Sequence, residues 1–282
     1  MGLDEKYKYP MTWEQAVLWL REQPGREQLV RDCYFDDPLI EAAWRYYNEA
    51  EWRCVRSFLP KPPGEALDVG AGRGIASYAL ALDGWSVTAL EPDPSPLVGA
   101  EAIRSLARES GLRIEVIQQW GEHLPFPDNS FDIIHARQVL HHADDLEALC
   151  KELYRVLRPG GNLLATREHV VNNADDIPIF LAAHPLHDQY GGESAYTLDQ
   201  YSGALERAGF IINTILSPYE SPINYFPATE QDVSYAVGRS LFGPLWPRSF
   251  VVPKVVVNFV SRRLTTPGRL YSFIAKKYEN SK

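Results

Sequence analysis

The stretch 65-EALDVGAGRG-74 decides the fold, because a short apolar run ends there in an acid and a series of glycines. The run 65–69 has the length and composition of a buried strand. Glycines at alternate positions from Gly70 onward let the backbone turn into a helix and approach a ligand closely. The spacing is G-x-G-x-G, and Asp68 stands two positions before the first glycine, which differs from the G-x-G-x-x-G of dinucleotide folds.

Downstream of this loop, strand-like runs alternate with segments of helical periodicity. Such alternation implies a largely parallel sheet with helices on both faces. We therefore predict an α/β, Rossmann-like, doubly wound fold with a mostly parallel seven-stranded sheet. After 65–69, its strands are SVTALE (86–91), RIEVIQQW (113–120), FDIIHAR (131–137), NLLATREHV (162–170), FIINTIL (210–216) and LYSFIAKK (270–277).

Gly and Pro clusters divide the chain into four segments of one domain. Residues 1–60 carry aromatic and apolar residues every three to four positions, which predicts an N-terminal helical cover. Residues 61–217 form the Rossmann-like core. Residues 218–269 have clustered prolines and no strand pattern, so we expect an inserted lid, and 270–282 supply the last strand and a tail.

Composition excludes several classes of protein. The chain has 282 residues, 45% of them hydrophobic, and its three cysteines are odd in number and far apart, which argues against a disulfide framework or a structural zinc site. The opening MGLDEKYKYP is charged, and the apolar stretch 250–260 is interrupted by Pro253, Lys254 and Asn258, so we expect neither a signal peptide nor a spanning helix. A cytoplasmic protein is the expectation.

The net charge of −9 disfavours a nucleic-acid binder, but the charge is unevenly distributed. Residues 239–282 contain nine Lys/Arg and one acid. Two interpretations stay open for this segment: peripheral contact with an anionic membrane or a phosphate group, or packing of the lid with exposed charges. The sequence carries no signal for the oligomeric state.

The glycine loop, Glu91 at the end of the second strand, and 119-QWGEHLPFPDNSFDIIHARQVLHHADD-145 occur in an order that resembles the class I S-adenosylmethionine-dependent methyltransferases. The resemblance covers roughly residues 64–166, including the helix that ends in RVLRPGG. It implies S-adenosylmethionine as cofactor and S-adenosylhomocysteine as product. It also implies that 61–217 is the cofactor-binding core.

The resemblance assigns cofactor contacts to positions at the carboxyl ends of the strands. The glycine loop would hold the methionine and ribose part, Glu91 the ribose diol, and Arg137 would lie beside the methionine end. Trp120 stands where many family members have an acid for the adenine amino group, so stacking and backbone amides are expected there. The full predicted set is Asp68, Gly70, Ala71, Gly72, Glu91, Pro92, Trp120, Gly121, Glu122 and Arg137.

Methylation of a hydroxyl needs a group that takes its proton, and histidine titrates in the right range. The region after the fifth strand offers His169, His184 and His187 as candidate catalytic residues. The alternative is that these side chains only satisfy one another beneath the lid. We expect His141 and His142 to be structural, because the family commonly has a helix-start motif there. No ligand spacing indicates a metal, so none is predicted.

The sequence thus predicts a methyltransferase that methylates a hydroxyl of a small molecule or glycan. The stretches 184-HPLHDQYGGE-193 and 267-PGRLYSF-273 resemble a bacterial branch of the family associated with surface-glycan and glycolipid genes, which favours a sugar hydroxyl. Alternatives are an N- or C-methyltransferase of an amine, lipid or quinone, or a noncatalytic S-adenosylmethionine-binding partner protein. The glycine spacing disfavours a nicotinamide oxidoreductase.

Overall fold

The computed structural model describes residues 10–278, so the predicted charged opening at 1–9 and the end of the tail at 279–282 lie outside the described residues. Eight strands of the described chain form one sheet in the order β3-β2-β1-β4-β5-β8-β7, with β6 paired to β5. The strands are β1 (Glu65–Val69), β2 (Ser86–Leu90), β3 (Ile114–Ile117), β4 (Phe131–Arg137), β5 (Leu157–Val171), β6 (Tyr196–Thr197), β7 (Ile211–Leu216) and β8 (Arg269–Lys276).

Thirteen α-helices and two short 3-10 helices connect and flank these strands in the described residues. They are α1 (Trp13–Glu22), α2 (Glu27–Asp32), α3 (Leu39–Asn48), α4 (Ala50–Ser57), α5 (Ile75–Asp83), α6 (Ala100–Ser110), η1 (Leu140–His142), α7 (Leu146–Val156), η2 (Ala174–Asp176), α8 (Ile177–Ala183), α9 (His187–Tyr190), α10 (Leu198–Ala208), α11 (Pro222–Tyr225), α12 (Glu230–Phe242) and α13 (Lys254–Ser261).

The predicted Rossmann-like α/β fold is confirmed. Strand β1 runs parallel to both β2 and β4, and β8 is antiparallel to β5 and β7. The strand number differs from the predicted seven, because Tyr196–Thr197 adds a two-residue strand beside the end of β5. That pairing is too short to produce an alternating pattern in the sequence.

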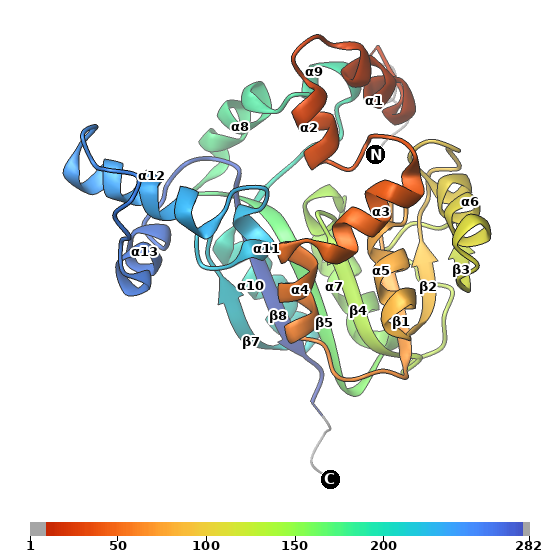
Figure 1. The fold of residues 1–282 in the computed structure, drawn as a ribbon. Helices are drawn as coiled ribbons and strands as arrows, with labels where there is room; N and C mark the ends of the chain where they lie inside the picture. Colours follow the sequence, from red (N-terminus) through yellow and green to blue (C-terminus); the bar gives the residue numbers. More distant parts are fainter. Residues whose placement is uncertain (1–9, 279–282) are drawn as a thin grey trace.

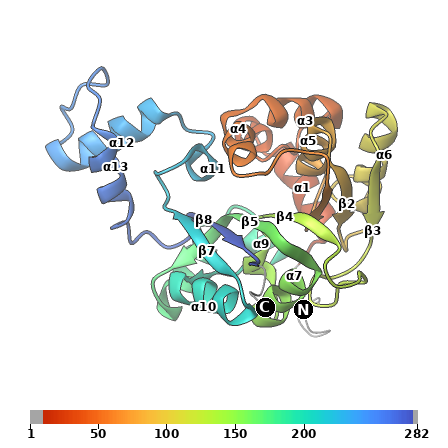
Figure 2. The same cartoon turned by 90° about the horizontal axis from the view of Figure 1, so that it is seen from below.

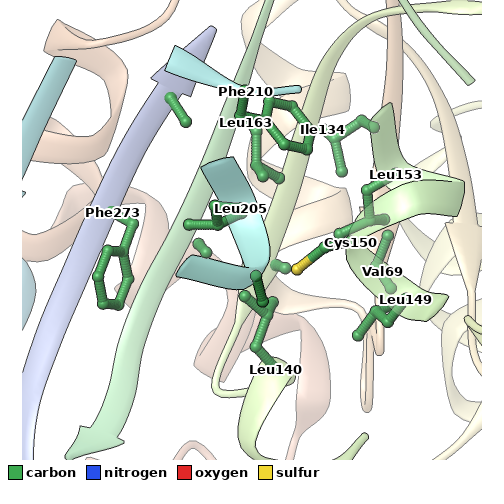
Figure 3. Packing of buried hydrophobic residues seen from close by; sticks show 14 of the residues in the cluster. Val69, Ile134, Leu140, Leu149, Cys150, Leu153, Leu163, Leu205, Phe210 and Phe273 are labelled. Carbon is green, nitrogen blue, oxygen red and sulfur yellow. The ribbon is translucent and has the colours of Figure 1, made fainter. Parts of the chain in front are cut away.

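Helices cover both faces of the sheet, as Figure 1 and the turned view in Figure 2 show. One face carries α3, α4 and α5, and the other carries α7 and α10. On the second face, Val69, Ile134 and Leu163 from three neighbouring strands pack against Leu149 and Leu153 of α7 (Figure 3). This apolar core fixes β1, β4 and β5 side by side, so their carboxyl ends form one edge.

The predicted helical cover consists of four short helices, α1 to α4. The breaks lie at a left-handed Gly25, at Pro38, and at Glu49, which is extended. Helix α1 begins with a capping box between Thr12 and Gln15. The breaks let the cover bend over the carboxyl edge of the sheet and along α5 (Figure 1).

Residues 218–268 contain α11, α12 and α13 and no strand among these described positions. Helix α11 packs near α4, while α12 and α13 project away from the sheet in both views (Figures 1 and 2). No helix of the described chain combines the length and apolar character needed to cross a membrane.

Candidate functional site

The glycine loop between β1 and α5 has the backbone geometry of a ligand cradle. Gly70 has φ +59°, and a Cβ on it would lie 2.7 Å from a methyl carbon of Val139, so the close packing of these two loops requires glycine. Gly72 has φ +54° and only open space where a Cβ would stand. The N–H of Ala71 donates to the Leu90 carbonyl at 3.0 Å, which ties the loop to β2.

Asp68 is buried beneath this loop, and both of its oxygens have protein partners. Ser77 of α5 donates to Oδ2 at 2.6 Å, and Nδ1 of His135 lies 3.1 Å from Oδ1. His135 is the residue paired with Asp68 in the β1–β4 register. Asp68 therefore connects β1, β4 and α5 and braces the loop from below.

Glu91 follows β2 and lies across from the glycine loop. Its Oε2 accepts from the Gly72 N–H at 2.7 Å, and its Oε1 accepts from the Asp93 N–H at 2.9 Å. Burial raises the pKa of Glu91 to about 7, against the opposing effect of these two hydrogen bonds. The half-buried Pro92 follows directly.

The turn after β3 borders the carboxyl edge of the sheet, where the glycine loop and Glu91 also lie. The Trp120 side chain is 65% exposed, and an added Cβ on Gly121 would meet Leu149 at 2.7 Å. Glu122 accepts from the Asp144 N–H at 3.3 Å. An exposed indole offers a stacking surface, and the glycine keeps the turn close to α7.

Arg137, at the end of β4, is held by the N-terminal cover. It donates to both oxygens of the buried Glu51 at 2.6 and 3.2 Å, and Arg167 lies 3.7 Å from the same carboxylate. Burial would raise the pKa of Glu51, but the two guanidinium groups lower it overall. The resemblance placed Arg137 beside the methionine end of the cofactor, and in the structure its guanidinium forms an ion pair with the buried Glu51.

A bulge in β5 creates the centre of the site. The β5–β8 register shifts between Ala165 and Glu168, and Arg167 adopts φ +61°. The fully buried Glu168 then accepts from the backbone N–H groups of Val139 and His141, each at 3.1 Å. Because Val139 also packs on Gly70, Glu168 is linked to the glycine loop through a single residue.

His141 is paired with this carboxylate: its Nδ1 lies 2.7 Å from Glu168 Oε2. Burial raises the pKa of Glu168 and lowers the pKa of His141 well below its usual value. The imidazole is therefore neutral near pH 7. With the proton on Nδ1, its Nε2 keeps a lone pair, 3.7 Å from Glu193.

The structure brings two of the three predicted histidines to this pair. The ring of His169 lies 4.8 Å from that of His141, and its Nδ1 lies 2.9 Å from the Gly268 carbonyl. His184 Nε2 is 3.7 Å from Glu193. Burial lowers the pKa of His169 to about 3 and also lowers that of His184. His187 begins α9, one turn beyond His184.

We define the His/Glu cluster as His141, Glu168, His169, His184 and Glu193. The ligand atoms of His141, His169 and Glu193 all lie within 4.8 Å of one another. Helices α1 and α2 of the N-terminal cover pack on the segment that carries His184 and Glu193. There, Trp13 packs on Tyr190 at 5.2 Å, and Leu186 joins the apolar core of α1 and α2.

This geometry, a glycine cradle faced by a carboxylate at the next strand, agrees with the comparisons with known proteins. A methyltransferase-domain family model matches residues 67–165. Residues 67–165 form a class I S-adenosylmethionine-dependent methyltransferase domain.

The chain spans less than half the length of the first curated relatives that it matches, and by their names its relatives act on different kinds of atom. A ubiquinone biosynthesis O-methyltransferase of Pseudomonas putida is 36% identical over 101 residues, which cover 35% of this chain and 42% of that protein. A sarcosine/dimethylglycine N-methyltransferase of Halorhodospira halochloris is 30% identical over 200 residues, 69% of this chain and 66% of its own.

A putative sarcosine dimethylglycine methyltransferase structure from Galdieria sulphuraria has a TM-score of 0.56 at 18% identity, with 86% of this chain and 88% of that chain covered. At this identity the likeness concerns the fold alone.

The residues around the glycine loop fit the cofactor of this domain family. Gly72 leaves room for close approach to the backbone, and Glu91 is an acceptor suited to a ribose diol. The exposed Trp120 ring suits a purine. Each oxygen of Asp68 and of Glu91 already has one protein partner and keeps a further lone pair for a ligand. Cofactor contact by the Arg137 guanidinium would require exchange of its hydrogen bonds to Glu51.

Replacement of Glu91 by alanine is expected to weaken S-adenosylmethionine binding about 10- to 150-fold, because roughly 1.5–3 kcal/mol of hydrogen bonding to the ribose is lost. Isothermal titration calorimetry measures it, with Glu101→Ala, an exposed acid on α6, as the control. Unchanged affinity in the Glu91 variant would remove the ribose assignment.

Proposed function

We propose that this methyltransferase methylates a hydroxyl group of a small molecule or sugar. The observation that carries the proposal is the Glu168–His141 pair, a neutral imidazole oriented by a buried carboxylate beside the glycine loop. A hydroxyl is a poor nucleophile until its proton is removed, whereas a neutral amine needs no base for attack. A preoriented base is therefore most useful for an oxygen acceptor.

Bound S-adenosylmethionine supplies an electrophilic methyl group and a sulfide leaving group. His141 Nε2 accepts the hydroxyl proton as the oxygen–carbon bond forms. Glu168 holds the ring and stabilises the imidazolium that results, and its backbone hydrogen bonds keep the 139–141 segment against Gly70. His169, beside the His141 ring, and His184, beside Glu193, contact the acceptor. The cover and α9 exclude water.

A second candidate is methylation of an amine, and it is favoured by the N-methyltransferase relative, whose match is the longer of the two. The O-methyltransferase relative supports the first candidate. Methylation of a carbon centre in a lipid or quinone is a third chemistry, and a noncatalytic partner role would leave the cofactor unconsumed.

The product decides between these functions. We expect an extract of small metabolites and glycans, incubated with the protein and S-adenosyl-[methyl-²H₃]methionine, to yield a labelled methyl ether in mass spectrometry. A labelled methylamine or C-methyl product would overturn the hydroxyl assignment. No formation of S-adenosylhomocysteine with any fraction would favour the noncatalytic role.

The same cluster also has the donor types of a divalent metal site. Its spread of up to 4.8 Å exceeds the roughly 3.3 Å between neighbouring ligands of a tetrahedral zinc with bonds near 2.0–2.1 Å. We propose that the histidines act without a metal.

A further inference from the structure

Helices α12 and α13 with the connecting residues 243–253 form a lobe that stands apart from the sheet in both views (Figures 1 and 2). We call residues 230–263 the α12–α13 lobe. It has an apolar core of its own, in which Val233 and Val237 pack with Val252 and Val257. Its fold therefore does not require its outer surface to be covered.

The outer surface of the lobe is unusually apolar. Of thirteen exposed large hydrophobic residues in the described chain, seven lie between Leu241 and Phe259. Leu245 is 93% exposed, and Val251 is 76% exposed. The surface is continuous at its tip, because the Trp246 ring stacks on Phe242 at 4.6 Å and meets Phe250 at 5.5 Å. Monomeric soluble proteins rarely expose such clusters without a binding role.

Positive charge is interleaved with these apolar side chains. Residues 239–278 contain eight Lys/Arg and no Asp or Glu. Arg248 and Arg262 are paired with Asp232 and Glu220, which lie outside that stretch. By contrast, within the described chain no carboxylate lies within 4 Å of Arg239, Lys254 or Arg263.

We propose that the α12–α13 lobe docks on the surface of an anionic lipid bilayer. A bilayer offers apolar depth for Leu245, Phe250 and Val251 and phosphate groups for the unpaired cations. A second copy of the chain would bring the same positive surface against itself, which is unfavourable. Contact is expected to be peripheral and reversible, because α13 has only eight residues and lies on its own lobe core.

The basic segment 239–282 also contains cations that lie outside the lobe. Arg269 begins β8 and donates to the Val170 carbonyl at 3.2 Å, so it belongs to the sheet edge and not to the lobe. Arg263 lies 3.5 Å above the Phe259 ring, which places a charge directly beside an exposed aromatic face. Charge and apolar surface thus coincide on α13.

Cosedimentation with vesicles tests the proposal. The intact chain should pellet with phosphatidylcholine/phosphatidylglycerol vesicles, less so with phosphatidylcholine alone, and less as salt increases. The double variant Lys254→Gln/Arg263→Gln should lose about 30-fold in partition coefficient. Leu245→Ser/Val251→Ser should also weaken binding. The matched control is Arg108→Gln/Lys151→Gln, two exposed cations on α6 and α7.

Three results would overturn the inference. If the protein pellets equally with both vesicle types, or with neither, the lobe does not bind an anionic bilayer. Release by millimolar inorganic phosphate at constant ionic strength would assign the cations to a free phosphate. A concentration-dependent dimer in sedimentation velocity that Leu245→Ser dissociates would assign the lobe to a second copy. None of these outcomes depends on which acceptor is methylated.

Discussion

Replacement of His141 by glutamine is expected to lower kcat by about 10²- to 10⁴-fold while the dissociation constant of S-adenosylmethionine stays within a few-fold. The side chain lies between Glu168 and Glu193, with Nδ1 2.7 Å from the Glu168 carboxylate and Nε2 3.7 Å from that of Glu193. Glutamine can still donate to Glu168, but it offers no basic nitrogen. Initial rates of S-adenosylhomocysteine formation with the identified acceptor measure the effect.

The lowered pKa of the His141 imidazole also determines how kcat depends on pH. A histidine whose pKa is lowered by burial becomes protonated only at a pH below its usual value, so the active neutral form persists as pH falls through 6.5. We expect the acidic limb of the kcat profile to lie below that of an exposed histidine. An acid limb centred near 6.5 would contradict a buried base.

Two controls separate the base from other roles. His123→Gln removes an exposed histidine outside the cluster and should leave kcat unchanged. Dialysis of the wild-type protein against a chelator should leave its rate unchanged, because the proposed mechanism uses no metal. Loss of the rate on dialysis, with recovery on addition of Zn²⁺ or Mn²⁺, would instead assign the His/Glu cluster to a metal. A full rate for the His141 variant would make the cluster structural.

The fold was predictable because its signals are local. The runs that became β1 and β4 are short and mostly apolar, β1 lies between Gly64 and Gly70, and both strands have the predicted bounds. The two-residue β6 carried no such signal. The cover was read as helical, but the way its helices bend over the site depends on contacts between distant residues, such as Arg73 to the Tyr34 carbonyl at 2.7 Å.

The site was only partly predictable. Glu91 and the glycine loop are recognisable by spacing, and the structure has them in contact. His141 was expected to be structural, because the family commonly has a helix-start motif at its position. The sequence alone does not reveal that a bulge in β5 brings Glu168 to its ring. The signal that could have indicated this pairing was Glu168 itself, next to His169, because an acid in a buried strand requires a partner. Glu51 carried no functional signal at all.

Replacement of Glu51 by alanine is expected to destabilise the folded protein by about 3–5 kcal/mol, because the substitution leaves Arg137 and Arg167 buried without their shared carboxylate. Glu51 is 0% exposed and joins the N-terminal cover to the end of β4 through Arg137 and to the bulge of β5 through Arg167. Its lowered pKa means that its contribution is complete at neutral pH and is lost as pH falls through that lowered value. Urea unfolding at pH 7 measures the change.

A double-mutant cycle shows whether the loss of unfolding free energy in Glu51→Ala comes from the unpaired charge of Arg137. Glu51→Ala/Arg137→Met removes one charge of each sign, so its cost should be smaller than the sum of the two single variants. Glu41→Ala removes an exposed acid from α3 and should change the unfolding free energy by no more than about 0.5 kcal/mol. If Glu51→Ala is no more destabilising than Glu41→Ala, the buried ion pair does not hold the cover on the sheet, and packing of Tyr46 and Trp52 against the core must do so instead.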